Sequence, residues 1–221
     1  MQRLVLFDLD NTLVDRRDTL AAWIADFAAR RRLGADAEQD LMGLLGERAY
    51  PSSFEQIRTR YRLADTADDL WQSYRAGMAA MVSCPPDVLD GLAELRARGW
   101  RVGVATNGAT DIQTAKLRST GIRARVHGIC ISEEAGVRKP DPRHFALAAE
   151  RCGVMPASNG WMIGDNPVND IGGGRAAGLG TVWIAGGARW PADLPAPDHS
   201  VERTRSAVEL LLTDGISGRT A

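Results

Sequence analysis

The chain has 221 residues, of which 44% are hydrophobic, so it can bury a sizeable core in one larger domain or in a core with a small appendage. Its formal net charge of -1 provides no positive surface for nucleic acid or an anionic membrane, and we expect neither as a partner. No apolar run approaches the roughly 20 residues of a membrane span. Three cysteines without metal-ligand spacing indicate reduced thiols in the cytoplasm.

The first predicted element is a buried strand at residues 3–7, which leads directly into Asp8 and Asp10. A continuous apolar run of this kind is typical of a strand covered on both faces in a parallel sheet. Side chains two residues apart in an extended segment point the same way, so the two carboxylates converge. At about 5 Å and an effective dielectric near 20 they repel by roughly 3 kcal/mol, which requires a cation, a shared proton or an open, wet location. The alternative is a polar turn with solvated acids.

The next stretch, from residue 16 to about residue 82, predicts only helices. Apolar residues recur at helical spacing, and Pro51-Ser52-Ser53 is a helix-start signature. Its aromatic residues and methionines are typical of core packing. We therefore expect an all-helical domain at residues 15–83, inserted after the first strand into a core made of residues 1–14 and 84–221.

After Cys84 strands and helices alternate. Repeated strand–helix units predict an α/β fold, with a doubly wound parallel sheet and helices on both faces. We expect the strands at residues 100–105, 126–131, 161–163, 181–184 and 199–201.

Three further segments place polar groups at the edge of the sheet where the first acidic pair lies. They are Thr106-Asn107, Lys139 before Pro140, and Asp165 with Asp170. Each alone is also explained as a strand-to-helix turn, a surface lysine or helix caps. Together with the first acidic pair, they set four carboxylates against one lysine. That surplus of negative charge calls for a hard divalent cation held by oxygens, and Mg²⁺ is the obvious candidate.

This set of motifs resembles the haloacid dehalogenase superfamily of hydrolases, and the resemblance covers most of the chain. The helical insert is similar to the cap domain of the subfamily, called IA, whose cap follows motif one, and the core is expected to be Rossmann-like. Asn11 departs from the family pattern, in which glycine is common at this position. The matching segments are Asp8-Leu9-Asp10-Asn11-Thr12 for the first motif, Thr106 for the second, Lys139 for the third, and Gly164-Asp165 with Asp170 for the fourth.

The resemblance implies roles for the acidic residues. Asp8, ionised at pH 7, attacks phosphorus and forms an aspartyl-phosphate. Asp10 protonates the departing alkoxide and then deprotonates the water that hydrolyses the intermediate. Mg²⁺ is held by the Asp8 carboxylate, the Asp10 backbone carbonyl and Asp165.

The resemblance also implies how the phosphoryl group is bound. Thr106 and the Asn107 backbone contact its oxygens, and Lys139 orients Asp8 and neutralises developing charge. Asp170 positions Lys139 or a metal-bound water.

The acid at position 10 favours a phosphatase over a dehalogenase, because an alkoxide leaving group needs a proton and a halide does not. We therefore expect a Mg²⁺-dependent phosphatase of a small phosphorylated metabolite, acting as a monomer or homodimer. The alternatives are a phosphomutase or dehalogenase of the same superfamily, a receiver-like phospho-accepting module, and a metal-binding protein without turnover.

Overall fold

The computed structural model describes residues 3–47, 49–154 and 160–213. The chain divides into two compact units, each with its own core. The core unit comprises Met1–Val14 and Ser83–Ala221, and the helical unit comprises Asp15–Val82. In the described part of the chain, no helix combines the length and the apolar character needed to cross a lipid bilayer.

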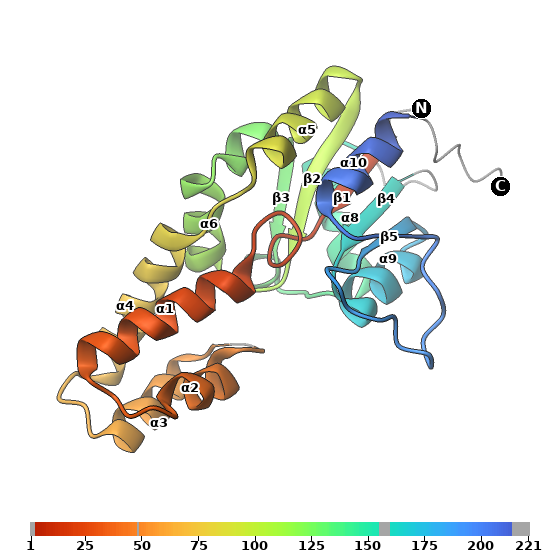
Figure 1. The fold of residues 1–221 in the computed structure, drawn as a ribbon. Helices are drawn as coiled ribbons and strands as arrows, with labels where there is room; N and C mark the ends of the chain where they lie inside the picture. The colour runs from red at the N-terminus through yellow and green to blue at the C-terminus, as the bar shows by residue number, and fades with distance from the viewer. Residues whose placement is uncertain (1–2, 48, 155–159, 214–221) are drawn as a thin grey trace. The chain divides into compact units, whose positions relative to one another are not determined.

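The core unit contains, within the described residues, a six-stranded sheet in the order β3-β2-β1-β4-β5-β6 (Figure 1). Every neighbouring pair in this order is parallel, which confirms the predicted fold class. The strands are β1 (Arg3–Phe7), β2 (Trp100–Thr106), β3 (Gly128–Ile131), β4 (Gly160–Gly164), β5 (Gly180–Ile184) and β6 (His199–Val201).

The strand order reverses between β1 and β4, because the chain runs outward from β1 to β3 and then returns to the other side of β1. In open α/β sheets, ligands bind at the carboxyl ends of strands at such a switch point. Asp8 lies at this place, and its backbone N–H donates to the Ile163 carbonyl of β4 at 2.9 Å.

Strand β1 is buried on both faces, as its apolar run predicts. Leu4 and Leu6 pack with Phe145 and Ala148 in one core cluster. The strand alternation turns Val5 toward the other face, where it is also fully buried.

Two layers of helices cover the sheet (Figure 1). Helices α5 and α10 pack together and contact β2 and β5, while α8 contacts β1, β2 and β3 and packs against α9. The sequence analysis did not anticipate the π-helical turn η2, which directly follows β4. The bounds are α5 (Pro86–Ala97), α6 (Thr110–Ser119), η1 (Ile122–Arg125), α7 (Ser132–Ala135), α8 (Pro142–Arg151), η2 (Pro167–Gly172), α9 (Gly173–Ala176) and α10 (Thr204–Leu212).

The helical unit is built around stacked and edge-on aromatic rings. Trp23 and Tyr74 have ring centroids 5.1 Å apart, and Phe54 and Tyr74 have theirs 5.2 Å apart. Such pairs stabilise a small core beyond the apolar area that they bury. The described helices of this unit are α1 (Arg16–Arg31), α2 (Ala37–Leu45), α3 (Pro51–Tyr61) and α4 (Ala67–Met81).

Candidate active site

A buried ion-pair cluster lies at the carboxyl end of β1. The Lys139 ammonium donates to Oδ1 of Asp8 and to Oδ1 of Asp170, each at 2.6 Å. The side chains of Lys139 and Asp170 are only 2% and 1% exposed, and that of Asp8 is 11% exposed. Lys139 therefore holds the Asp8 carboxyl group in place, and a small part of the Asp8 side chain remains accessible to solvent.

Lys139 is fixed by its backbone as well as by its side chain. The Asn107 amide donates to the Lys139 carbonyl at 3.0 Å and accepts from the Lys139 N–H at 2.9 Å. The Lys139–Pro140 peptide bond is cis. Asp141 then caps α8 by accepting from the Arg143 N–H. Asn107 directly follows β2, and its two hydrogen bonds therefore hold the loop that carries Lys139 next to the sheet.

Asp170 is positioned by the π-helical turn η2. Its Oδ2 accepts from the Asn166 N–H at 2.9 Å, while the Asn166 side chain accepts from the N–H groups of Val168 and Asn169. A Cβ at Gly164 would lie 2.3 Å from Oδ2 of Asp170. Glycine at the end of β4 is therefore what lets the buried carboxylate approach the sheet.

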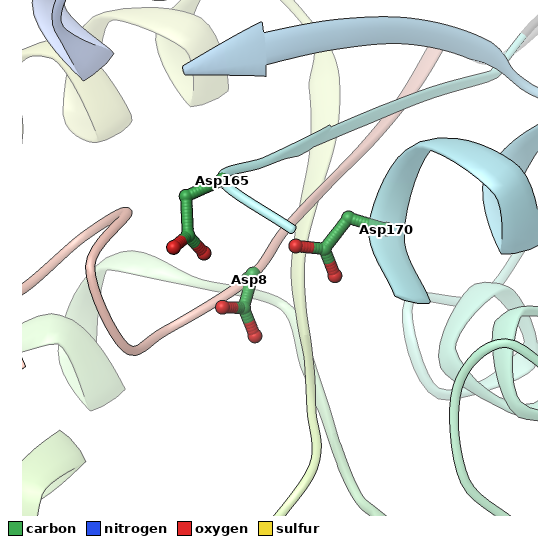
Figure 2. Close-up of side chains that lie close together, drawn as sticks. All are labelled: Asp8, Asp165 and Asp170. Atoms are coloured by element: carbon green, nitrogen blue, oxygen red, sulfur yellow. The ribbon is translucent and has the colours of Figure 1, made fainter. Parts of the chain in front are cut away.

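Three carboxyl groups converge here. One carboxylate oxygen from each of Asp8, Asp165 and Asp170 lies within 4.8 Å of the other two. Figure 2 shows the three side chains lying close together, with Asp165 and Asp170 on either side of Asp8. A donor set made of oxygens alone fits a hard cation such as Mg²⁺. Because both oxygens of Asp170 already accept hydrogen bonds, Asp8 and Asp165 are the better placed ligands.

Burial and mutual repulsion make Asp8 and Asp165 hard to ionise. Burial, together with the charges of Asp170 and Asp165, raises the pKa of Asp8 to about 8 in spite of Lys139. Burial and Asp170 raise the pKa of Asp165 to about 6. Burial alone would lower the pKa of Lys139, but Asp170 and Asp8 more than offset it and keep the ammonium charged. The expectation of an ionised Asp8 at pH 7 therefore requires a further positive charge, which a cation among the carboxylates would supply.

A second polar network joins Asp10 to Thr106 at the end of β2. The Gln113 amide donates to Oγ1 of Thr106 at 2.7 Å and to Oδ2 of Asp10 at 3.2 Å. Lys116, which like Gln113 belongs to α6, donates to the two Asp10 oxygens at 2.7 and 3.0 Å. The sequence analysis missed both α6 residues. The available signal was that the chain has only two lysines, Lys116 and Lys139.

The predicted site residues thus fall into two connected groups. Asp8, Lys139 and Asp170 are in direct contact, with Asp165 beside them. The other group contains Asp10 and Thr106, and Asn107 connects the end of β2 to the lysine loop.

A family model described as haloacid dehalogenase-like hydrolase matches residues 2–178. The chain belongs to this family. As a member it is an enzyme, a hydrolase, and its similarity to known proteins extends over most of its length.

Two relatives and one solved structure show what the chain is similar to. It is 34% identical to phosphoserine phosphatase from Thermus thermophilus over 83% of this chain and 65% of that protein. It is 31% identical to glyceraldehyde 3-phosphate phosphatase from Methanopyrus kandleri over 96% of this chain and 97% of that protein. The crystal structure of a HAD phosphatase from Thermococcus onnurineus covers 99% of this chain and 100% of its own, with 22% identity and a TM-score of 0.67, and so shares the fold.

Proposed function

We propose that this hydrolase is a Mg²⁺-dependent phosphatase of small phosphorylated metabolites that works through an aspartyl-phosphate. The observation that carries the proposal is Asp8, held at the switch point of the sheet by a buried lysine and faced by two further carboxyl groups. Both relatives described above are phosphatases.

In the first half of the reaction, an Asp8 oxygen attacks the substrate phosphorus. The new O–P bond forms as the bond from phosphorus to the leaving oxygen breaks, and Asp10 gives that oxygen its proton. When bound between Asp8, the Asp10 carbonyl and Asp165, Mg²⁺ would reduce the repulsion between the carboxylate and an anionic phosphate.

In the second half, water attacks the phosphorus of the aspartyl-phosphate. The Asp10 carboxylate takes a proton from this water as the bond between phosphorus and Asp8 breaks. Inorganic phosphate leaves, Asp8 is again a carboxylate and Asp10 is again protonated. Every group that changes in the first half is thereby restored.

The remaining site residues bind the phosphoryl group or hold the catalytic side chains in place. Lys139 holds Asp8 and offsets charge that develops on the phosphoryl oxygens, and Asp170 fixes Lys139. Thr106 accepts a hydrogen bond from Gln113, so its own hydroxyl hydrogen can be donated to a phosphoryl oxygen. The Asn107 N–H would bind a second oxygen.

The substrate class follows from the helical unit and the named relatives. We assign residues 15–83 as a cap, and closure of a cap over the site would exclude bulk water and large substrates. We therefore expect a small phosphorylated metabolite as substrate, in the cytoplasm, with the enzyme active as a monomer or homodimer.

The test is phosphate release from para-nitrophenyl phosphate with Mg²⁺ and after its removal by a chelator. We expect release only with the cation, and a loss of at least about 10³-fold in Asp8→Asn, because the amide cannot form the intermediate. Mass spectrometry of quenched wild-type enzyme should find a phosphoryl group on the peptide that contains Asp8. The matched control is Asp90→Asn, at an exposed position of α5, which should keep full activity. Undiminished activity of Asp8→Asn would refute the assignment.

A further inference from the structure

Each aspartate of the first motif has its own lysine. Lys139 pairs with Asp8 and Lys116 pairs with Asp10, and these are the only two lysines among 27 lysine and arginine residues. Both lysine side chains are nearly buried, 2% and 3% exposed. In a chain that otherwise uses arginine, both positions that carry a compact ammonium lie against this acidic pair.

The contacts to Asp10 come from one face of one helix. Gln113 and Lys116 are three residues apart in α6 and therefore project side by side. Lys116 contacts both carboxylate oxygens, and Gln113 contacts one of them. The Asp10 side chain nevertheless stays 21% exposed, whereas Lys116 is covered. The carboxyl group is thus held from the protein side and presented to the solvent side.

We propose that Lys116 and Gln113 are positioning residues for Asp10, which orient its carboxyl group for proton transfer to the leaving oxygen. The inference rests on the proposed phosphatase function and adds two residues to it. Neither residue needs to touch the substrate.

The orientation matters because proton transfer depends on distance and direction. The Asp10 proton must reach the leaving oxygen while the bond from that oxygen to phosphorus breaks, and a misplacement of about 1 Å can cost about 10²-fold in rate. The ammonium fixes the carboxyl group through both oxygens. The Gln113 amide also donates to Thr106, so it links the proton donor to the hydroxyl proposed to bind the phosphoryl group.

Lysine and arginine are not equivalent at this position. The lysine ammonium is a compact point charge, whereas a guanidinium is larger and planar and would hold the carboxyl group in a different geometry. Lys116→Arg keeps the charge and should therefore restore only part of any activity that Lys116→Met loses.

A purely structural role for the ion pair predicts a different result. If Lys116 only held α6 against the loop after β1, its loss would slow all substrates equally. If Lys116 positions the proton donor, the loss of activity is larger for esters whose leaving group depends more on protonation.

The experiment measures kcat/KM for phenyl phosphate, para-nitrophenyl phosphate and dinitrophenyl phosphate, whose leaving groups need progressively less protonation. This parameter reports the steps up to formation of the aspartyl-phosphate and is not affected by its hydrolysis. For Lys116→Met we expect a loss of about 10² with phenyl phosphate, in the range usual for general acid catalysis, and less than about threefold with dinitrophenyl phosphate. The control is Arg118→Met, at an exposed position of the same helix, which should match wild type throughout.

A second variant covers the case in which Lys116→Met does not fold. Gln113→Met leaves the ion pair in place and removes only the amide, and it should show the same dependence on leaving group with a smaller loss. An equal loss with all three esters, or no loss, would overturn the positioning role while wild-type activity upheld the phosphatase. If the wild-type enzyme released phosphate from none of the esters, the phosphatase proposal and this inference would both fail.

Discussion

Each aspartate of the first motif is paired with its own buried lysine, Asp8 with Lys139 and Asp10 with Lys116. Removing one member of a buried ion pair leaves an uncompensated charge, which commonly costs about 3–5 kcal/mol.

One buried residue near this site makes the stability sensitive to acid. His144 is fully buried in α8, and its Nδ1 lies 2.9 Å from the Val137 carbonyl. Burial lowers the pKa of His144 to about 4, although the contact with Val137 acts in the opposite direction. The folded protein therefore keeps this imidazole neutral at a pH where an unfolded chain would protonate it.

We predict that His144 contributes a loss of stability as the pH falls from about 6.5 toward 4. In this interval the unfolded chain binds a proton that the folded chain does not, which lowers the free energy of unfolding by up to about 3 kcal/mol. Urea denaturation at pH 7 and pH 4.5 should show a smaller loss for His144→Asn than for wild type.

The contribution of His144 can be separated from that of other titrating groups. Asp8, whose pKa is raised, works in the opposite direction, because the folded state then takes up protons more readily as the pH falls. That contribution is common to wild type and variant and cancels between them. Phe145→Leu, at a buried position of α8 with a side chain that cannot titrate, serves as the control and should keep the wild-type pH dependence. The idea fails if His144→Asn behaves like this control.

At the scale of elements, the site is assembled from strand ends and one helix face. The strand ends were predictable, because polar residues that directly follow apolar runs meet at one edge of a parallel sheet. The contribution of α6 was not predictable. Its buried face carries Gln113 and Lys116, but the sequence of this segment has the pattern of an ordinary amphipathic helix. The π-helical turn η2 was also missed, since its single turn is set by the contacts of Asn166 and Asp170.

Close packing of helix on sheet relies on glycine at particular positions. A Cβ at Gly128 of β3 would lie 2.5 Å from the backbone carbonyl carbon of Arg151 in α8. We predict that Gly128→Ala destabilises the protein by about 1–3 kcal/mol, because α8 would have to move away from the sheet. Thermal unfolding measures this as a lower Tm.

The matched comparison is another glycine without such a neighbour. Gly43 is exposed within α2, and a Cβ there would meet nothing within 4 Å. Gly43→Ala should therefore leave Tm unchanged or raise it, because alanine favours a helix by about 1 kcal/mol over glycine. Equal effects of the two substitutions would contradict the packing argument.

At the scale of the whole molecule, the chain divides into an α/β unit and a helical unit, and the proposed site residues belong to only one of them. Every residue with a proposed catalytic or metal-binding role belongs to the core unit, as do Gln113 and Lys116. In the sequence, the helical unit lies between Asp10 and the later site residues, which begin at Thr106.

We predict that the enzyme hydrolyses small phosphomonoesters and not phosphorylated proteins. A cap that closes over the site would admit a metabolite and exclude a folded polypeptide. The measurement is phosphate release from a panel of sugar phosphates, phosphoglycolate, nucleoside monophosphates and phosphoserine, alongside an intact phosphoprotein. Turnover of the phosphoprotein with none of the small esters would contradict the prediction.

The sequence by itself determined the sheet, its strand ends and the family. Apolar runs that end in charged residues have few stable solutions other than a buried parallel sheet, and the order of the motifs along the chain is specific. Only the tertiary structure decided which charges touch. Lys116 and Asp10 are 106 residues apart in the chain, and their contact depends on how α6 packs beside β1 and β2. Distances of this kind arise from folding as a whole, so no local pattern of residues encodes them.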